Sequence, residues 1–315
     1  MQPGQKKVKM RERIKMEKPL ISVVTLTYKK FDYIYKAIDS VLNQTYPYVE
    51  YIISDDGSPN FPQNEIEDYV SNRKGKNIIK FSIISSHKNS GTVKNINRAY
   101  QAATGEILIP LSADDMFYSE DVVDEIVAAF SKKKCNVLVT SRMACAENGT
   151  ELRKLPSAKS EKYIRNLDTA YKQHLAFITD EFYNMASGSA MYIKKSFIDN
   201  WGYFDEKYVL WEDGPFLTQY TRNNIISTAY EIISIKYRLG GVSNGKPHPL
   251  MRKDRELYNE TDRVAEVSEI KKSQKRKIEY ICKRYKVSSW NQKLFLYLAY
   301  PDVMVEKVIY KIRQE

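Results

Sequence analysis

Strand and helix patterns alternate along the first 140 residues of this 315-residue chain. Each unit is a short, β-branched apolar run, followed after a turn by apolar residues at helical spacing. Strands that alternate with helices in this way indicate βαβ units and a largely parallel sheet. We therefore predict an α/β fold, with a Rossmann-like, mostly parallel sheet flanked by helices. The expected strands span residues 20–27, 49–54, 78–85 and 107–111.

Two of the expected strands end in a pair of aspartates. Asp55 and Asp56 follow the second strand, and Asp114 and Asp115 follow the fourth. Ligands of open α/β sheets collect outside the carboxyl ends of the strands, so both pairs would face one crevice. Paired carboxylates there suit a hard divalent cation that also holds phosphate oxygens. Local alternatives stay open, because Asp-Gly-Ser-Pro is a turn signal and an aspartate pair can cap the next helix.

The net charge of +11 is concentrated at the two ends of the chain. Residues 1–18 hold seven Lys/Arg and two Glu, and residues 246–315 hold seventeen Lys/Arg and ten Asp/Glu. A nucleic-acid-binding core would carry its basic surface on the folded domain, so we expect no nucleic-acid partner. We predict a disordered basic arm at 1–15, a main domain at 16–250 and a basic helical appendage at 251–315.

Hydropathy and cysteine usage indicate a cytoplasmic protein. No apolar run approaches the ~20 residues of a membrane-spanning helix, and no signal-peptide core follows the basic N-terminus. Three widely spaced cysteines without histidine partners predict reduced thiols: Cys135, Cys145 and Cys282. The basic appendage has two interpretations, a solvated face packed on the main domain or an amphipathic surface that rests on anionic lipid at the inner face of the membrane.

The second half of the chain shows a weaker pattern. Residues 146–185 have no clear period, which predicts an irregular segment of the kind that often forms a binding loop or lid. Glu212 and Asp213 then open a helix. Acidic residues in a first helical turn are favourable for capping alone, so the residues by themselves assign this pair no function.

Five ordered motifs resemble those of the family 2 glycosyltransferases, which are nucleotide-sugar-dependent enzymes with a GT-A fold. The motifs are TLTYKK, SDDGSPN, KNSGTVKNINRAY, ATGEILIPLSADD and VLWEDGPF, and the resemblance covers about residues 19–243. It implies that 16–250 is a GT-A domain that moves one sugar from a nucleoside diphosphate sugar, with UDP-sugar favoured, to an acceptor hydroxyl. The implied reaction inverts the anomeric carbon, and the implied acceptor is a glycan or lipid-linked molecule in bacterial-type surface-glycan or glycoconjugate assembly.

The resemblance also implies a nucleotide site. The second strand would supply the carboxylate that accepts from the imide N–H of the base, and the turn and helix after Asn89 would lie along the nucleotide and ribose. The nucleotide-binding residues implied in this way are Thr27, Tyr28, Asp55, Asp56, Asn89, Gly91, Asn97 and Asp114.

Metal binding and catalysis are implied by two further matches. Asp114 matches the second, metal-binding acid of the family's Asp-x-Asp motif and would hold Mn²⁺ or Mg²⁺ against the diphosphate, although Ser112 stands where the first acid is usual. His248 is either a further metal ligand from a loop or a loop histidine without a role. Asp213 matches the catalytic base, and Glu212 is the next candidate.

Two other functions remain as alternatives. A sugar-nucleotide nucleotidyltransferase would share the sheet and metal but should carry a Gly-rich phosphate loop after the first strand, and residues 25–30 contain no glycine. A degenerate nucleotide-sugar-binding subunit would bind donor without turnover. Non-processive transfer is favoured, because the Gln-x-x-Arg-Trp sequence of polymerising relatives has no proper counterpart here.

Overall fold

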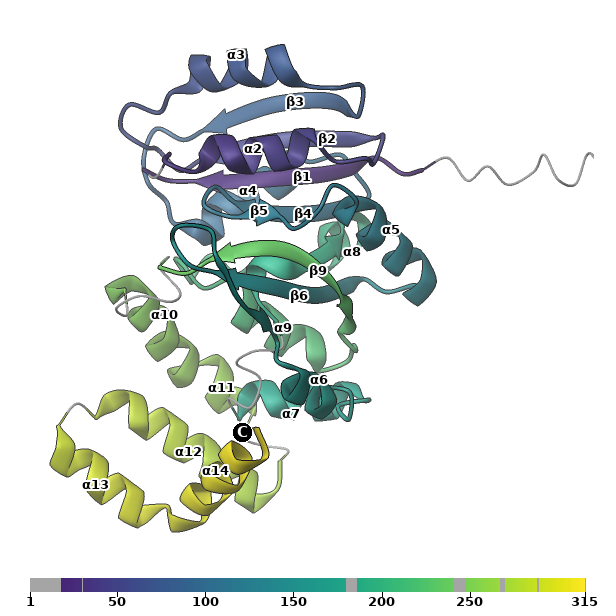
Figure 1. Cartoon of the computed structure of the whole chain (residues 1–315). Helices are drawn as coiled ribbons and strands as arrows, with labels where there is room; N and C mark the ends of the chain where they lie inside the picture. Colours follow the sequence, from purple (N-terminus) through teal and green to yellow (C-terminus); the bar gives the residue numbers. More distant parts are fainter. Residues whose placement is uncertain are drawn as a thin grey trace, which may run out of the picture.

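The computed structural model describes residues 18–29, 31–179, 186–240, 248–266, 270–287 and 289–314, with side chains up to 309. Its centre is one nine-stranded sheet of order β3-β2-β1-β4-β8-β6-β9-β5, and β7 pairs with β6 outside this path (Figure 1). A cluster of helices lies at the end of the molecule remote from β3 and α3. The predicted α/β class is confirmed.

The first half of the sheet is parallel and matches the predicted strand-helix alternation. Strands β1, β2 and β4 are buried on both faces, and this explains their continuous apolar sequences. The elements are β1 (Ile21–Thr27), α2 (Ile34–Leu42), β2 (Val49–Asp55), α3 (Gln63–Arg73), β3 (Ile78–Ser85), α4 (Thr92–Ala102), β4 (Ile107–Ser112) and α5 (Val122–Lys133).

Two hydrophobic clusters cover the two faces of the sheet. Successive side chains of a strand point to opposite faces, and Val23 and Val24 of β1 accordingly belong to different clusters. Helices α2, α3 and α5 contribute to the first cluster, and α4 and α9 (Asp213–Thr221) contribute to the second. Burial on both faces fixes the strand register, and with it the positions of the residues at the strand ends.

The second half of the sheet is mixed. β8 (Met191–Lys194) runs antiparallel to both β4 and β6 (Val137–Cys145), and β9 (Ser227–Arg238) runs parallel to β6. The remaining elements here are β5 (Met116–Phe117), β7 (Glu151–Leu155), the 3₁₀ turn η1 (Gly188–Ala190) and α8 (Lys195–Trp201).

The expectation of an irregular segment at 146–185 is wrong for its described part. Strand β7 and two short helices, α6 (Ala158–Ile164) and α7 (Ala170–Ile178), lie there. The hydroxyls of Ser157 and Thr169 cap the two helices by accepting the N–H of the third residue along. Helices of fewer than ten residues complete too few turns to produce a clear period.

The predicted C-terminal helices are present as α10 (Pro249–Glu260), α11 (Asp262–Ala265), α12 (Lys272–Lys286), α13 (Trp290–Ala299) and α14 (Pro301–Gln314). Tyr258 of α10 belongs to the core cluster of the main domain, whereas α12, α13 and α14 share a small cluster of their own. The boundary at 250/251 stays a prediction, and the arm at 1–15 lies outside the described residues. No helix in the described part of the chain could cross a bilayer, and the three cysteines are free thiols.

Candidate active site

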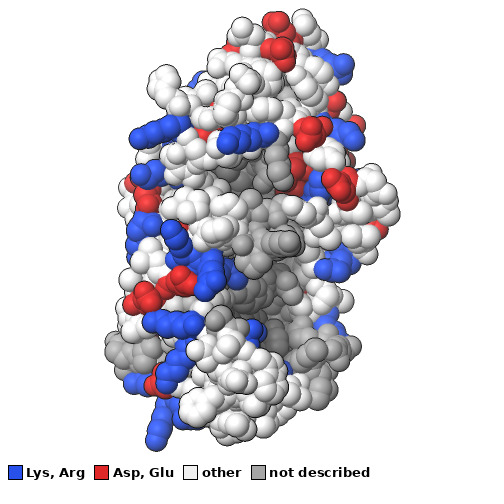
Figure 2. All heavy atoms as spheres, turned by 90° about the vertical axis from the view of Figure 1, so that its left-hand side faces the viewer, with Lys and Arg blue, Asp and Glu red and all other residues white. Residues whose placement is uncertain are grey.

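The candidate site lies at the carboxyl ends of the parallel strands. Parallel pairing sets Thr27 beside Asp55 and Leu26 beside Ser112, so the ends of β1, β2 and β4 meet at one edge of the sheet. In Figure 1 the arrowheads of β1 and β3 point to the left, and Figure 2 looks onto that side of the molecule. Both predicted acidic pairs therefore start from the same edge.

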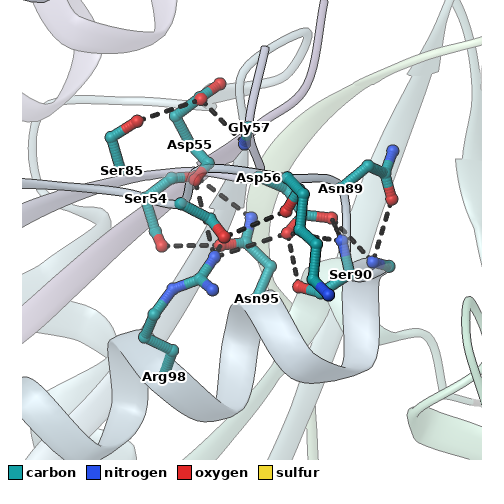
Figure 3. Close-up of polar contacts among 12 residues, drawn as sticks. Ser54, Asp55, Asp56, Gly57, Ser85, Asn89, Ser90, Asn95 and Arg98 are labelled. Carbon is teal, nitrogen blue, oxygen red and sulfur yellow. Dashed lines mark hydrogen bonds and ion pairs between the residues drawn. The ribbon is translucent and has the colours of Figure 1, made fainter.

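Asp55 is a fully buried carboxylate that organises the turn after β2 (Figure 3). Its Oδ2 accepts the N–H groups of Gly57 at 3.0 Å and Ser58 at 2.8 Å, and its Oδ1 accepts the Ser58 hydroxyl. The Ser85 hydroxyl, at the end of β3, donates to Oδ2 at 3.3 Å. Asp55 thus holds the turn and the neighbouring strand end together.

Asp56 accepts several hydrogen bonds from the loop before α4 (Thr92–Ala102). Its two oxygens accept the Ser90 N–H at 3.0 and 3.1 Å, and Oδ1 accepts the Ser90 hydroxyl at 2.6 Å. Its Oδ2 also accepts the Gly91 N–H at 2.7 Å, and Arg98 lies 3.4 Å from Oδ1. A contact of either Asp55 or Asp56 with a base stays a prediction, and such a contact would have to share these oxygens.

Gly91 joins this loop to a distant segment. Its φ is +93°, and a Cβ there would lie 2.5 Å from both the carbonyl oxygen and the Cγ1 of Val209. The Val93 N–H donates to the same Val209 carbonyl at 3.1 Å. Only glycine allows this approach, which brings the loop at the first acidic pair against the chain leading to Glu212.

Tyr28 and Asn89 expose polar side-chain groups to solvent beside the loop before α4. Tyr28 is exposed, and hydrogen bonds with Lys29 and Asn89 lower the pKa of its hydroxyl. Thr27, next to Tyr28, is buried, and its hydroxyl has no hydrogen-bond partner among the described residues. The predicted nucleotide residues Thr27, Tyr28 and Asn89 therefore lie together and retain polar atoms for a ligand.

The side chain of Asn97, on α4, bonds to the backbone of a distant loop. It is buried, its amide nitrogen donates to the Phe204 carbonyl at 2.8 Å, and its Oδ1 accepts the Phe204 N–H at 3.1 Å. These bonds hold the loop after α8 against α4. A direct nucleotide contact of Asn97 stays a prediction.

The pair at the end of β4 contains an unsatisfied carboxylate. Asp115 is 2% exposed, and its Oδ1 accepts the Arg238 N–H at 2.9 Å. Its Oδ2 has no partner among the described residues. Burial, followed by the charge of the half-buried Asp114, raises the pKa of Asp115 well above its usual range.

An orphaned acidic oxygen beside a second carboxylate suits a divalent cation. The described residues contain no cluster of three or more His, Cys, Asp or Glu that could hold a metal, so Asp114 and Asp115 would need oxygens from a ligand or water. His248 caps α10, and its Nδ1 accepts the Leu250 N–H at 3.2 Å. Its role as a metal ligand stays a prediction.

Glu212 and Asp213 form the third acidic pair, at the start of α9. The Asp213 carboxylate accepts the Gly188 N–H at 2.8 Å and the Gly214 N–H at 2.7 Å, and these bonds fix its position. Burial and the neighbouring charge of Asp213 raise the pKa of Glu212 to about 8. Glu212 is therefore largely protonated at neutral pH, while Asp213 is held by backbone donors.

Arg142 of β6 is a site residue that the sequence analysis missed. Its side chain is buried, donates to the Ser187 hydroxyl at 2.8 Å and lies 4.6 Å from the ring centroid of Tyr237. Burial lowers the pKa of Arg142, and the charges of Asp115 and Asp213 oppose that shift. The available signal was a single arginine in the otherwise uncharged run VLVTSRMAC. Arg142 places a buried cation within electrostatic reach of Asp115 and Asp213, one member of each of the second and third acidic pairs.

Asp254 of α10 is a second residue that was missed. Its carboxylate accepts three consecutive backbone N–H groups, from Val209 at 3.0 Å, Leu210 at 2.6 Å and Trp211 at 3.1 Å. It is buried and lies more than forty residues along the chain from its partners. Asp254 holds the segment that leads directly into Glu212 and Asp213.

Similarity to solved structures supports the fold. The complex of S. aureus TarS 1–349 with UDP-GlcNAc matches with a TM-score of 0.59 and 18% identity, over 85% of this chain and 71% of that one. A mannosyltransferase from Pyrobaculum calidifontis, PcManGT, in complex with GDP-Man and Mn²⁺, matches with a TM-score of 0.55 and 12% identity, over 95% and 86%. The predicted GT-A fold is confirmed.

Sequence relatives are glycosyltransferases. A putative teichuronic acid biosynthesis glycosyltransferase of Bacillus subtilis, TuaG, is 29% identical over 137 residues, 44% of this chain and 52% of that protein. An uncharacterized glycosyltransferase of Methanocaldococcus jannaschii, MJ1057, is 27% identical over 231 residues, 73% and 74%. The chain thus spans about half the length of TuaG. The model of glycosyl transferase family 2 matches residues 22–201, more than half of the chain, so this protein belongs to the family 2 glycosyltransferases.

Proposed function

We propose that this glycosyltransferase moves a single sugar from a nucleoside diphosphate sugar, preferably a UDP-sugar, to a hydroxyl of a glycan or lipid-linked acceptor. The observation that carries the proposal is the arrangement around Arg142, whose guanidinium is within electrostatic reach of both Asp115 and Asp213. A donor diphosphate is anionic and an acceptor hydroxyl must lose a proton, so the reaction needs positive charge and a base in one place.

Asp213 is the base in this proposal. Sugar hydroxyls are very weak acids, so a positioned carboxylate must take the proton as the new bond forms. The bonds from Gly188 and Gly214 fix the Asp213 side chain, and the protonated Glu212 beside it adds no competing charge at neutral pH. One attack on the anomeric carbon from the face opposite the leaving diphosphate inverts its configuration.

The donor lies over the carboxyl ends of β1, β2 and β4 in this proposal. Tyr28, Asn89 and the Thr27 hydroxyl contact the nucleotide, and the Asp55–Asp56 loop shapes that side of the site. Asp114 and Asp115 would hold Mn²⁺ or Mg²⁺, and the bound cation would supply positive charge that stabilises the leaving diphosphate. Two structural neighbours, TarS 1–349 in complex with UDP-GlcNAc and PcManGT in complex with GDP-Man and Mn²⁺, support a nucleotide-sugar donor and a metal.

The biological setting that we propose is surface-glycan or glycoconjugate assembly on the cytoplasmic side of an anionic membrane. The relative TuaG, named for teichuronic acid biosynthesis, supports this setting. The charge of residues 246–315 supports a negatively charged surface as partner.

The test compares Asp213→Asn with Asp168→Asn, which removes a charge from the exposed end of a surface ion pair with Lys172. Nucleotide release is first followed with UDP-, GDP- and dTDP-sugars to identify the donor. Asp213→Asn should lower kcat by a factor of about 10² to 10⁴ with nearly unchanged nucleotide affinity, while Asp168→Asn should behave as wild type. Full activity of Asp213→Asn would exclude this base, and donor binding without turnover by the wild type would indicate a binding subunit.

Two further measurements test the finer parts. The anomeric configuration of the product, read by NMR, should be inverted, and a retained product would contradict the single displacement. UDP should bind more tightly with Mn²⁺ than with EDTA in calorimetry, and Asp114→Asn should remove that difference. Equal affinity with and without metal in the wild type would exclude the metal role.

A further inference from the structure

Helix α13 exposes an apolar face. Leu296 is buried in the cluster of α12, α13 and α14, whereas Trp290 is 72%, Phe295 75% and Leu298 71% exposed. Trp290, Leu294 and Leu298 follow one another at intervals of four residues and so form one stripe, roughly opposite Leu296. Isolated exposed apolar residues are common on proteins, but a contiguous helical stripe of large side chains marks an interaction surface.

Helix α14 continues the exposed apolar surface. Val303 of α14 is buried in the shared cluster, and Val305, Val308 and Ile309 are exposed. These three residues lie on one side of the helix at spacings of three and four. Both helices therefore pack one side into the shared cluster and leave apolar residues exposed on the other side.

The charge beside these helices is strongly positive. Residues 271–309 contain ten Lys/Arg and three Asp/Glu. Two cations of α12 reach the corner between α13 and α14: Lys283 donates to the Tyr300 hydroxyl at 2.7 Å, and Arg276 pairs with Asp302 at 2.8 Å. Figure 2 shows this lower end of the molecule as an uncharged surface with Lys and Arg beside it.

We propose that the α13 face, defined as Trp290, Leu294, Phe295 and Leu298, docks on an anionic phospholipid bilayer. Aromatic and aliphatic side chains enter the headgroup boundary, and the surrounding Lys and Arg bind the negative lipid surface. Charge selects this occupant over a second copy of the chain, because two copies joined through this face would bring two strongly basic helical clusters together. The proposal gives the membrane partner of the proposed function a defined surface.

Helices α12, α13 and α14 connect to the candidate active site through α10. Lys286 of α12 pairs with Glu260 of α10 at 2.9 Å, and the Cys282 thiol donates to the Asn259 carbonyl. Asp254, on the same helix α10, holds the segment before Glu212. The helices that carry the α13 face are therefore joined, through α12 and α10, to the segment that precedes the proposed base.

The test measures vesicle binding by the full chain. Wild type should co-sediment with phosphatidylcholine vesicles that contain about 30% phosphatidylglycerol and not with pure phosphatidylcholine. Binding should weaken as NaCl rises from about 0.1 M to about 0.5 M, because salt screens the lipid charge. The variant Trp290→Ser/Phe295→Ser/Leu298→Ser should bind at least about tenfold more weakly.

A matched control removes exposed apolar side chains elsewhere on the surface. The variant Ile79→Ser/Leu152→Ser/Ile225→Ser changes three exposed residues of the main domain and should bind as wild type. Trp290 gives a second signal, since its fluorescence should shift to the blue on anionic vesicles, and the shift should be absent from Trp290→Phe.

Three results would overturn the proposal. The first is that the α13-face variant binds vesicles as well as wild type, and the second is that both triple variants lose binding equally. The third is that wild type is a dimer that does not bind vesicles, while the α13-face variant is a monomer. The last result would assign the face to a second copy. Vesicle binding uses no sugar donor, so its failure leaves the proposed transfer untouched, and an inactive enzyme that docks leaves this inference untouched.

Discussion

The acidic pairs at the ends of β2 and β4 are alike in sequence and opposite in structure. Asp55 and Asp56 are buried carboxylates whose oxygens accept bonds from the turn and loop around them. Asp115 is just as buried, but one of its oxygens has no partner in the described structure, and its pKa is raised well above the usual range. The first pair stabilises the fold, whereas the second leaves a buried carboxylate oxygen unsatisfied.

This difference shows that a carboxylate's role is decided by the donors that surround it. Backbone N–H groups of tight turns converge on Asp55 and Asp56, so their buried oxygens have hydrogen-bond partners. Around Asp115 the main donor is one N–H of β9, while Asp114 adds a like charge. A buried carboxylate without compensation is costly, which makes Asp115 a candidate for a functional role.

The largest effect is expected for Asp55→Ala. The substitution leaves the N–H groups of Gly57 and Ser58 and two serine hydroxyls without their acceptor, so the free energy of unfolding should fall by about 3 kcal/mol. Asp114→Ala, at the half-buried member of the other pair, should change it by less than about 0.5 kcal/mol. Urea denaturation measures both, and equal losses would contradict the contrast.

A somewhat smaller loss is expected for Gly91→Ala. The new Cβ would enter the space of Val209 at a φ of +93°, and the strain should lower the free energy of unfolding by about 2 kcal/mol. Gly149→Ala is the control, because its φ is also positive but a Cβ there would meet nothing within 4 Å. A comparable loss in both variants would show that backbone strain, and not the contact with Val209, limits this position.

Asp115→Asn should increase stability, by about 1 kcal/mol at pH 8. The folded-state pKa of Asp115 is raised, so the wild-type carboxyl costs stability progressively as the pH rises above about 4, its unfolded value. The advantage of the variant should therefore grow with pH in thermal unfolding, and Mn²⁺ should stabilise wild type more than the variant. A variant that is less stable than wild type at pH 8 would contradict the unsatisfied oxygen.

The smallest effect is expected for Glu212→Gln. Because the pKa of Glu212 is raised to about 8, wild type is mostly protonated at neutral pH and glutamine imitates that form. Below about pH 7 kcat should change by less than about threefold, and the bend near pH 8 in the wild-type rate profile should disappear from the variant. A bend that persists in Glu212→Gln would assign it to another group.

The parallel half of the sheet could be predicted from the sequence because each strand is buried on both faces and reads as one apolar run. The placement of Asp55 and Asp114 at a common edge followed from that topology alone. Arg142 and Asp254 could not be predicted, because their partners are brought to them only by tertiary packing. The partners of Asp56 lie more than thirty residues away, so its pairing with Ser90 and Gly91 was equally hidden.

The three hydrogen bonds that Asp254 accepts also determine how much of the chain a truncated protein must retain. Every strand of the sheet is complete at Arg238, and an expressed fragment that stopped there would look like a full catalytic domain. It would lack the carboxylate that holds the N–H groups of Val209, Leu210 and Trp211. A fragment meant to retain turnover should therefore include α10, even if it omits the helices beyond it.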